Sequence, residues 1–184
     1  MLGAFVLNPL LMVLLMFATD LATMFVSMDR VTPSPGPEHW DIRRLVTTGS
    51  GLAGLLLLVS AAVYWVGSNT LRLSGAETQT LVFVWLVFGG AQAVLYLTRA
   101  RSFFWTKPRP GRWLLLASLF DILAVTLLAG LGWLMAPIPL FLVAGAFVLA
   151  VLFLVVGDLV KVGLMHLGTR APVGDVPRRP SSAA

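Results

Sequence analysis

The residue with the clearest capacity for chemistry is Asp20, which interrupts a long apolar run near the start of the chain. The run begins at Asn8 and reads NPLLMVLLMFATDLATMFVSM. A carboxylate in a membrane-length apolar segment costs about 2.5–3.5 kcal/mol on insertion scales, so such a residue indicates a proton or cation site. Thr19 and Thr23 flank it and offer hydroxyl groups as partners. The alternative is a carboxyl that stays protonated and hydrogen-bonded for structure.

Two further polar residues, Gln92 and Asp121, stand inside apolar runs and are secondary candidates for the ion site. Asp121 can line the same polar interior or pair with a basic group, and Gln92 can join two helices by a hydrogen bond. We favour the structural role for both. Asp158 and Lys161 are three residues apart, so they lie on one helical face and are predicted to form a structural ion pair.

Several kinds of site are not indicated by this sequence. The chain has no cysteine, which excludes disulfides, thiolate metal ligands and cysteine nucleophiles. We find no glycine-rich phosphate loop and no His-Glu metal motif. Asp20 and Asp121 match an intramembrane aspartyl protease by their number alone. We therefore predict no catalytic residue and no metal site on this chain.

The composition decides which elements must position these residues. Of the 184 residues, 58% are hydrophobic and only 11% are charged, whereas soluble domains carry about 25% charged residues. The mean hydropathy is +0.91, and a water-soluble globule of this size has too few core positions for so many apolar side chains. The chain is therefore predicted to be an all-α polytopic membrane protein. The net charge of +5 reflects membrane topology, and no nucleic-acid partner is expected.

Five apolar runs are long enough to span a membrane, which requires roughly 20 residues. They lack the alternation typical of a membrane β-barrel, so each is predicted to be a helix. We expect residues 1–167 to form one five-span transmembrane domain in contact with lipid, and residues 168–184 to form a disordered basic tail. The predicted spans cover residues 9–28, 46–66, 78–97, 114–135 and 138–162.

Basic residues fall almost entirely in alternate connections between these spans. Every Lys and Arg except Arg72 lies in the first connection, the third connection or the end of the chain. The positive-inside rule places the loops rich in Lys and Arg in the cytoplasm. We therefore expect the N-terminus outside the cell, the C-terminus in the cytoplasm, and the protein in the plasma membrane.

The first span and the segment after it resemble the sixth transmembrane helix and following loop of plasma-membrane proton-pumping P-type ATPases. The resemblance rests on Thr19-Asp20, on Met24, on the string SMDRVTPSPGP that starts at Ser27, and on Trp40. It extends over about residues 8–166. The later matching segments are Thr48-Gly49, Gln92-Ala93, the string TRARS from Thr98, Arg109-Pro110-Gly111, and the string DLVK from Asp158.

The resemblance implies that the five spans correspond to helices six to ten of such a pump. Asp20 would then be the intramembrane carboxylate that takes up and releases the transported proton. The family often has Asn-Asp-Gly at this point, whereas this chain has Thr19-Asp20-Leu21. The family's phosphorylated aspartate, its nucleotide-binding domain and its first five helices have no counterpart in this sequence.

We therefore expect a membrane sector of a P-type cation-transporting ATPase that provides part of an ion site and does not hydrolyse ATP alone. ATP and Mg²⁺ would bind the cytoplasmic domains of its partner, the N-terminal part of the pump. The chain would be a fragment, a separately encoded half or a truncated product. The alternatives are a standalone five-span protein with an assembly or regulatory role and a non-functional pump remnant.

Overall fold

The computed structural model of the chain describes residues 6–26, 42–99 and 111–168, and the regular structure within these ranges is helical. Four of the helical segments described are long and apolar enough to cross a membrane, and a shorter apolar helix precedes them. The prediction of an all-α five-helix bundle is confirmed. The helices are α1 (Pro9–Val26), α2 (Ile42–Trp65), η1 (Val66–Thr70), α3 (Gly75–Trp85), η2 (Leu86–Ala93), α4 (Val94–Arg99), α5 (Arg112–Leu131) and α6 (Leu140–Gly168).

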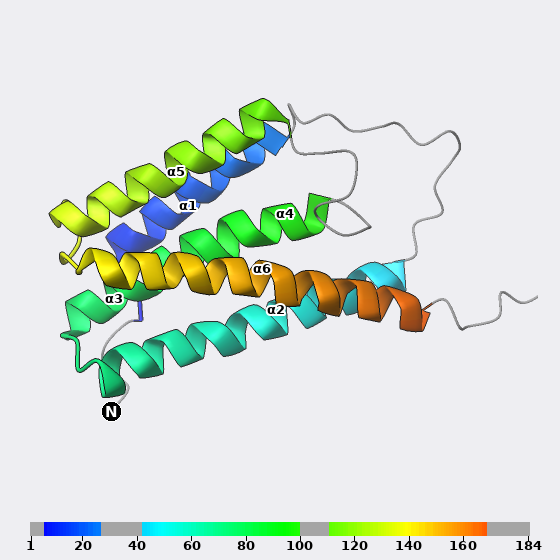
Figure 1. Cartoon of the computed structure of the whole chain (residues 1–184), viewed down its shortest axis with the longest axis horizontal. Helices are drawn as coiled ribbons and strands as arrows, with labels where there is room; N and C mark the ends of the chain where they lie inside the picture. Colours follow the sequence, from blue (N-terminus) through cyan, green and yellow to red (C-terminus); the bar gives the residue numbers. More distant parts are fainter. Residues whose placement is uncertain (1–5, 27–41, 100–110, 169–184) are drawn as a thin grey trace, which may run out of the picture.

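The continuous segment α3–η2–α4 lies at the centre of the bundle. It separates α1 and α5, which pack together on one side, from α2 and α6, which pack together on the other (Figure 1). In its most apolar stretch 72% of the residues are buried, against 28% or less in the other three long segments. The central segment is therefore mostly covered by protein, whereas the outer helices keep a broad apolar face exposed.

The helices alternate in direction, so that the termini of the helices fall into two groups. The last turns of α1, α4 and α6 and the first turns of α2 and α5 lie at the same end of the bundle, on the right in Figure 1. Arg112 and Lys161 lie toward this end. Arg72 lies at the opposite end, between η1 and α3. Of these three basic residues, two therefore lie toward one end of the bundle and one lies at the other.

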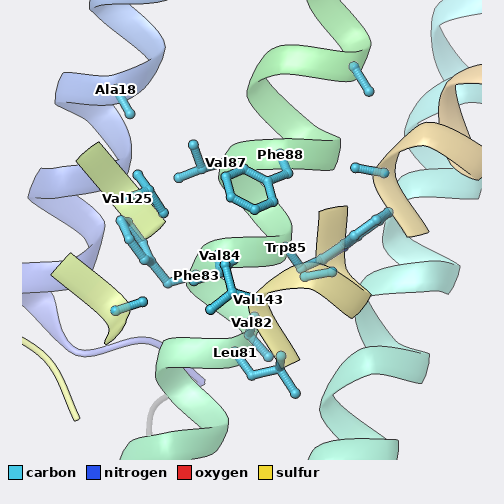
Figure 2. Close-up of a cluster of buried hydrophobic side chains, with 14 of the residues drawn as sticks. Ala18, Leu81, Val82, Phe83, Val84, Trp85, Val87, Phe88, Val125 and Val143 are labelled. Carbon is cyan, nitrogen blue, oxygen red and sulfur yellow. The ribbon is translucent and has the colours of Figure 1, made fainter. Parts of the chain in front are cut away.

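Trp85 is the largest side chain in the core and joins three segments. It is fully buried, its indole Nε1 donates to Ser60 Oγ of α2 at 2.9 Å, and its ring meets Phe153 of α6 edge-on at 5.6 Å between centroids. Figure 2 shows this ring between the central segment and α6. A Cβ atom on Gly89 would lie 2.7 Å from the ring, so the glycine leaves the space that the indole fills.

Two structural features differ from the predicted spans. The central segment contains the eight-residue π-helix η2, and α2 ends in the π-helix η1. The fourth span is predicted to reach Met135, but α5 ends at Leu131 because Gly132 has φ +72° and its N–H bonds to the Leu128 carbonyl. The connection to α6 is therefore longer than the predicted two-residue turn. The last two residues of the first predicted span and most of the predicted tail lie outside the described residues.

Candidate ion site

Asp20 lies in the second half of α1, eleven residues after Pro9, or about 16 Å along the helix axis at 1.5 Å per residue. Its side chain is exposed. Within the described residues, no side chain or backbone group bonds to its carboxylate. The structure therefore places the predicted ion-binding carboxylate within the apolar helix α1 but on the outer surface of this bundle.

The orientation of Asp20 follows from the packing of α1. Leu11, Ala18 and Ala22 are buried, and their spacing of seven and four residues forms one stripe along the helix. This stripe faces α5 and η2, and Ala18 is seen pointing into the core in Figure 2. Asp20 is two positions from Ala18, which is a rotation of about 200° around a helix with 3.6 residues per turn. The carboxylate therefore points away from the packed stripe.

The face around Asp20 is otherwise apolar and uncovered. Large hydrophobic residues three, four and seven positions away are each more than 60% exposed: Val13, Met16, Phe17 and Met24. A single carboxylate is thus surrounded by side chains suited to lipid or to another helix. Lipid offers the carboxylate no hydrogen bonds, whereas a neighbouring helix can.

The two threonines beside Asp20 do not bind its carboxylate in this structure. The Thr19 hydroxyl donates to the Leu15 carbonyl at 2.7 Å, and the Thr23 hydroxyl donates to the backbone carbonyl of Asp20 at 2.9 Å. Both are hydrogen bonds within the helix backbone that Thr commonly forms. Their lone pairs remain on the same exposed side of α1, so their predicted role as partners of an ion at Asp20 stays a prediction.

Gln92 and Asp121 come together in the bundle interior. Gln92 on η2 is 4% exposed, Asp121 on α5 is 6% exposed, and Gln92 Nε2 donates to Asp121 Oδ2 at 2.6 Å. A second polar contact joins α4 to α5, because the Tyr96 hydroxyl donates to Ser118 Oγ at 2.9 Å. Sequence reasoning did not select Tyr96 or Ser118. Their spacing, four residues after Gln92 and three before Asp121, is the helical repeat that identifies such pairs.

Asp158 and Lys161 form an ion pair that fastens α6 to the end of α4. Lys161 Nζ lies 2.6 Å from Asp158 Oδ1 and donates to the Leu97 carbonyl at 3.1 Å. Leu97 lies in the last turn of α4, where carbonyls have no partner within the helix. The ammonium group therefore neutralises a buried carboxylate and donates to a carbonyl at a helix C-terminus, and its structural role stays a prediction.

Asp20 is exposed and Asp121 is buried, but the two lie on neighbouring helices. A groove of about 300 Å³ runs between α1 and α5, and both Leu21 and Asp121 line it. The remaining residues of the groove are apolar: Trp113, Leu116, Ala117 and Phe120. Among the described residues, no three His, Asp or Glu side chains gather as a metal site would require.

Comparison with known proteins gives one informative relative. No family model matches the chain. The chain is 28% identical over 166 residues to the Methanocaldococcus jannaschii protein named "Putative cation-transporting ATPase". The match covers 89% of this chain and 20% of that protein, so the chain spans about a fifth of the length of this relative. In all, 17 known proteins match the chain significantly, so the similarity does not rest on one chance alignment.

The long apolar helices and the similarity to this ATPase agree with each other. The chain is a membrane protein, and its sequence is related to a stretch of a protein that bears the name of a cation transporter.

Proposed function

We propose that this chain is the ion-binding membrane sector of a P-type ATPase that exports protons, and that Asp20 is its proton carrier. Other transmembrane helices of the ATPase cover the open face of α1 and complete the site. ATP and Mg²⁺ bind cytoplasmic domains that belong to the rest of the ATPase. This chain supplies the intramembrane carboxylate and the bundle that holds it.

The observation that carries the proposal is the exposure of Asp20 on an otherwise apolar, uncovered face of α1. A carboxylate facing lipid costs about 2.5–3.5 kcal/mol on insertion scales, and the bundle described here contributes no group that offsets this cost. A relative in which the matching stretch is 20% of the length has ample further sequence to provide covering helices. The exposed carboxylate is therefore explained as half of a site.

Proton export is supported by the string from Ser27 to Trp40, which resembles the proton-pumping ATPases. In the proposed mechanism Asp20 binds a proton from the cytoplasmic side. A rearrangement driven by phosphorylation elsewhere in the ATPase then opens Asp20 to the outside, and the proton leaves. The test is ATP-driven transport by the assembled ATPase carrying Asp20→Asn, for which we expect no transport.

The orientation proposed for the sector has a direct test. The end of the bundle that carries Arg112 and Lys161 should face the cytoplasm of a cell, because basic connections are retained there. The chain contains no cysteine, so a single introduced cysteine can be labelled without interference. In intact cells a membrane-impermeant maleimide should label Ala136→Cys, in the connection before α6, and should leave Gly111→Cys, at the start of α5, unlabelled. If only Gly111→Cys were labelled, the orientation would be the opposite of the one proposed.

A further inference from the structure

The contact between Gln92 and Asp121 leaves one polar atom without a partner. The amide nitrogen of Gln92 donates to Asp121 Oδ2 at 2.6 Å, but the amide oxygen, Oε1, is buried and accepts no hydrogen bond from the part of the chain that the structure describes. A buried acceptor left unsatisfied costs about 1–3 kcal/mol. An interhelical contact that served packing alone would leave this cost uncompensated.

The Gln92 amide can serve both protonation states of the carboxyl beside it. An ionised carboxyl has only acceptors, so it requires the amide N–H that it now receives. A protonated carboxyl has an O–H to donate, and a 180° turn of the amide brings the oxygen where the nitrogen was. The free Oε1 atom is then the acceptor for that O–H. One side chain therefore satisfies the carboxyl before and after it gains a proton.

From this geometry we propose that Asp121 is a second intramembrane proton-binding site, separate from Asp20, with Gln92 as its hydrogen-bond partner in both states. One proton from the aqueous phase binds one carboxylate oxygen of Asp121, and the site loses one negative charge. Asp121 lies nine residues after Arg112, or about 14 Å along α5. The proton must therefore cross roughly half of the bundle to reach it.

The Tyr96–Ser118 contact marks the route. Both hydroxyls lie about one helical turn from the Gln92–Asp121 pair, on the side of the ends that carry Arg112 and Arg99. A hydroxyl pair can pass a proton by accepting one and releasing its own. Ser118 is offset from Asp121 by about 4.5 Å along the axis, a distance that one water molecule bridges. The neighbouring groove is almost wholly apolar, so it offers no competing polar path.

No other titratable group described on the elements around Asp121 is placed to act in its stead. The segments packed against α5 are α1, α3, η2 and α6, and α4 reaches it through the Tyr96 hydroxyl, which is bonded to Ser118. Asp20 is exposed on α1, Glu77 on α3 is bound to Ser74 at the opposite end of the bundle, and Asp158 on α6 is paired with Lys161. Among the described residues, η2 contributes only the neutral Gln92 to the contact.

The proposal is tested by infrared spectroscopy of the full chain in lipid nanodiscs. Aspartate labelled with ¹³C at the carboxyl separates its C=O band from that of glutamate, and spectra are compared across a pH titration. Asp20→Asn serves as the background, so that the first carboxyl makes no contribution. In this variant we expect a C=O band of protonated aspartate that changes with pH. The double variant Asp20→Asn/Asp121→Asn should lose this band, although asparagine has nearly the same size as aspartate.

Two positioning variants separate proton binding from simple packing. Gln92→Leu should move the Asp121 C=O band to higher frequency, because the protonated carboxyl loses its acceptor. Tyr96→Phe should slow protonation of Asp121 after a pH jump by several-fold while leaving the final spectrum unchanged. Circular dichroism confirms that each variant is folded.

Three results would overturn the proposal. One is a carboxyl at position 121 that keeps one protonation state throughout the titration. Another is an aspartate band unaffected by Asp121→Asn in a folded protein. The third is a band that responds to sodium chloride but neither to pH nor to choline chloride, which would make the site one for a metal cation. Since the experiment uses the isolated chain, its outcome is independent of whether Asp20 carries the transported ion.

Discussion

The Asp20→Asn substitution is expected to abolish ATP-driven cation transport by the assembled ATPase, down to the background of vesicles without the protein. Asparagine has nearly the same shape as aspartate, but it cannot ionise. A carrier group that cannot release and take up a proton has no means of moving charge across the membrane. The measurement is acidification of inside-out proteoliposomes on addition of ATP, followed with a pH-sensitive dye.

A matched control lies one helical turn away on the same face. Met16 is 66% exposed, and Met16→Leu is an apolar exchange of similar volume, which proteins tolerate well. We expect this variant to transport at the wild-type rate. Nucleotide binding should persist in both variants, because neither position lies in a cytoplasmic domain. Normal acidification by Asp20→Asn would remove Asp20 from the role of carrier.

Removing the charge of Lys161 is expected to give the largest loss of stability of any single substitution considered for this bundle. Asp158 is fully buried and Lys161 is 2% exposed. Lys161→Met would remove the ammonium group that lies against the buried carboxylate and that donates to the Leu97 carbonyl. Breaking a buried pair on one side costs about 3–5 kcal/mol. Unfolding of the purified chain in mixed micelles, followed by helix content, measures this free energy.

The double variant Asp158→Leu/Lys161→Met distinguishes a lost charge partner from a lost side-chain shape. Replacing both members of a buried ion pair by apolar residues of similar volume is often close to neutral, so this variant should recover most of the stability. Leu159→Met, at an exposed position between the two, should leave the unfolding free energy unchanged. If Lys161→Met alone unfolded like the wild type, the pair would have no structural role.

The sequence predicts the five-helix bundle well because the membrane leaves little choice. Each apolar run must satisfy its own backbone hydrogen bonds, and only a helix does so within one segment. The Asp158–Lys161 pair is also readable, since its geometry lies within one helix. The end of α5 is harder to predict from the sequence, because no pattern of apolar residues distinguishes the left-handed Gly132 from the helical glycines elsewhere in the chain.

The sequence indicates that Gln92 can bond to another helix, but it does not identify the partner residue. The central segment is mostly buried, so no polar face shows which of its residues point toward which neighbour. The π-helix η2 then changes the rotation from one residue to the next. The pairing of Gln92 with Asp121 depends on the burial of the central segment and on the rotation that η2 introduces. The exposure of Asp20 cannot be predicted from the sequence for a related reason. An apolar run shows that a helix lies in the membrane, but not which face packs against its own bundle.

The most direct test of the central claim is whether the Asp20 face of α1 is covered by other helices of the ATPase. Met16→Cys places a single reactive thiol on this face in a chain without cysteine, and a nitroxide attached there reports lipid exposure through its collision rate with oxygen. Leu57→Cys is the matched control, because Leu57 on α2 is 71% exposed. We predict a high collision rate at both positions in the isolated chain and a large fall at Met16→Cys alone in the active assembled ATPase. A label at Met16→Cys that remained as exposed to lipid in the active ATPase as in the isolated chain would contradict the account.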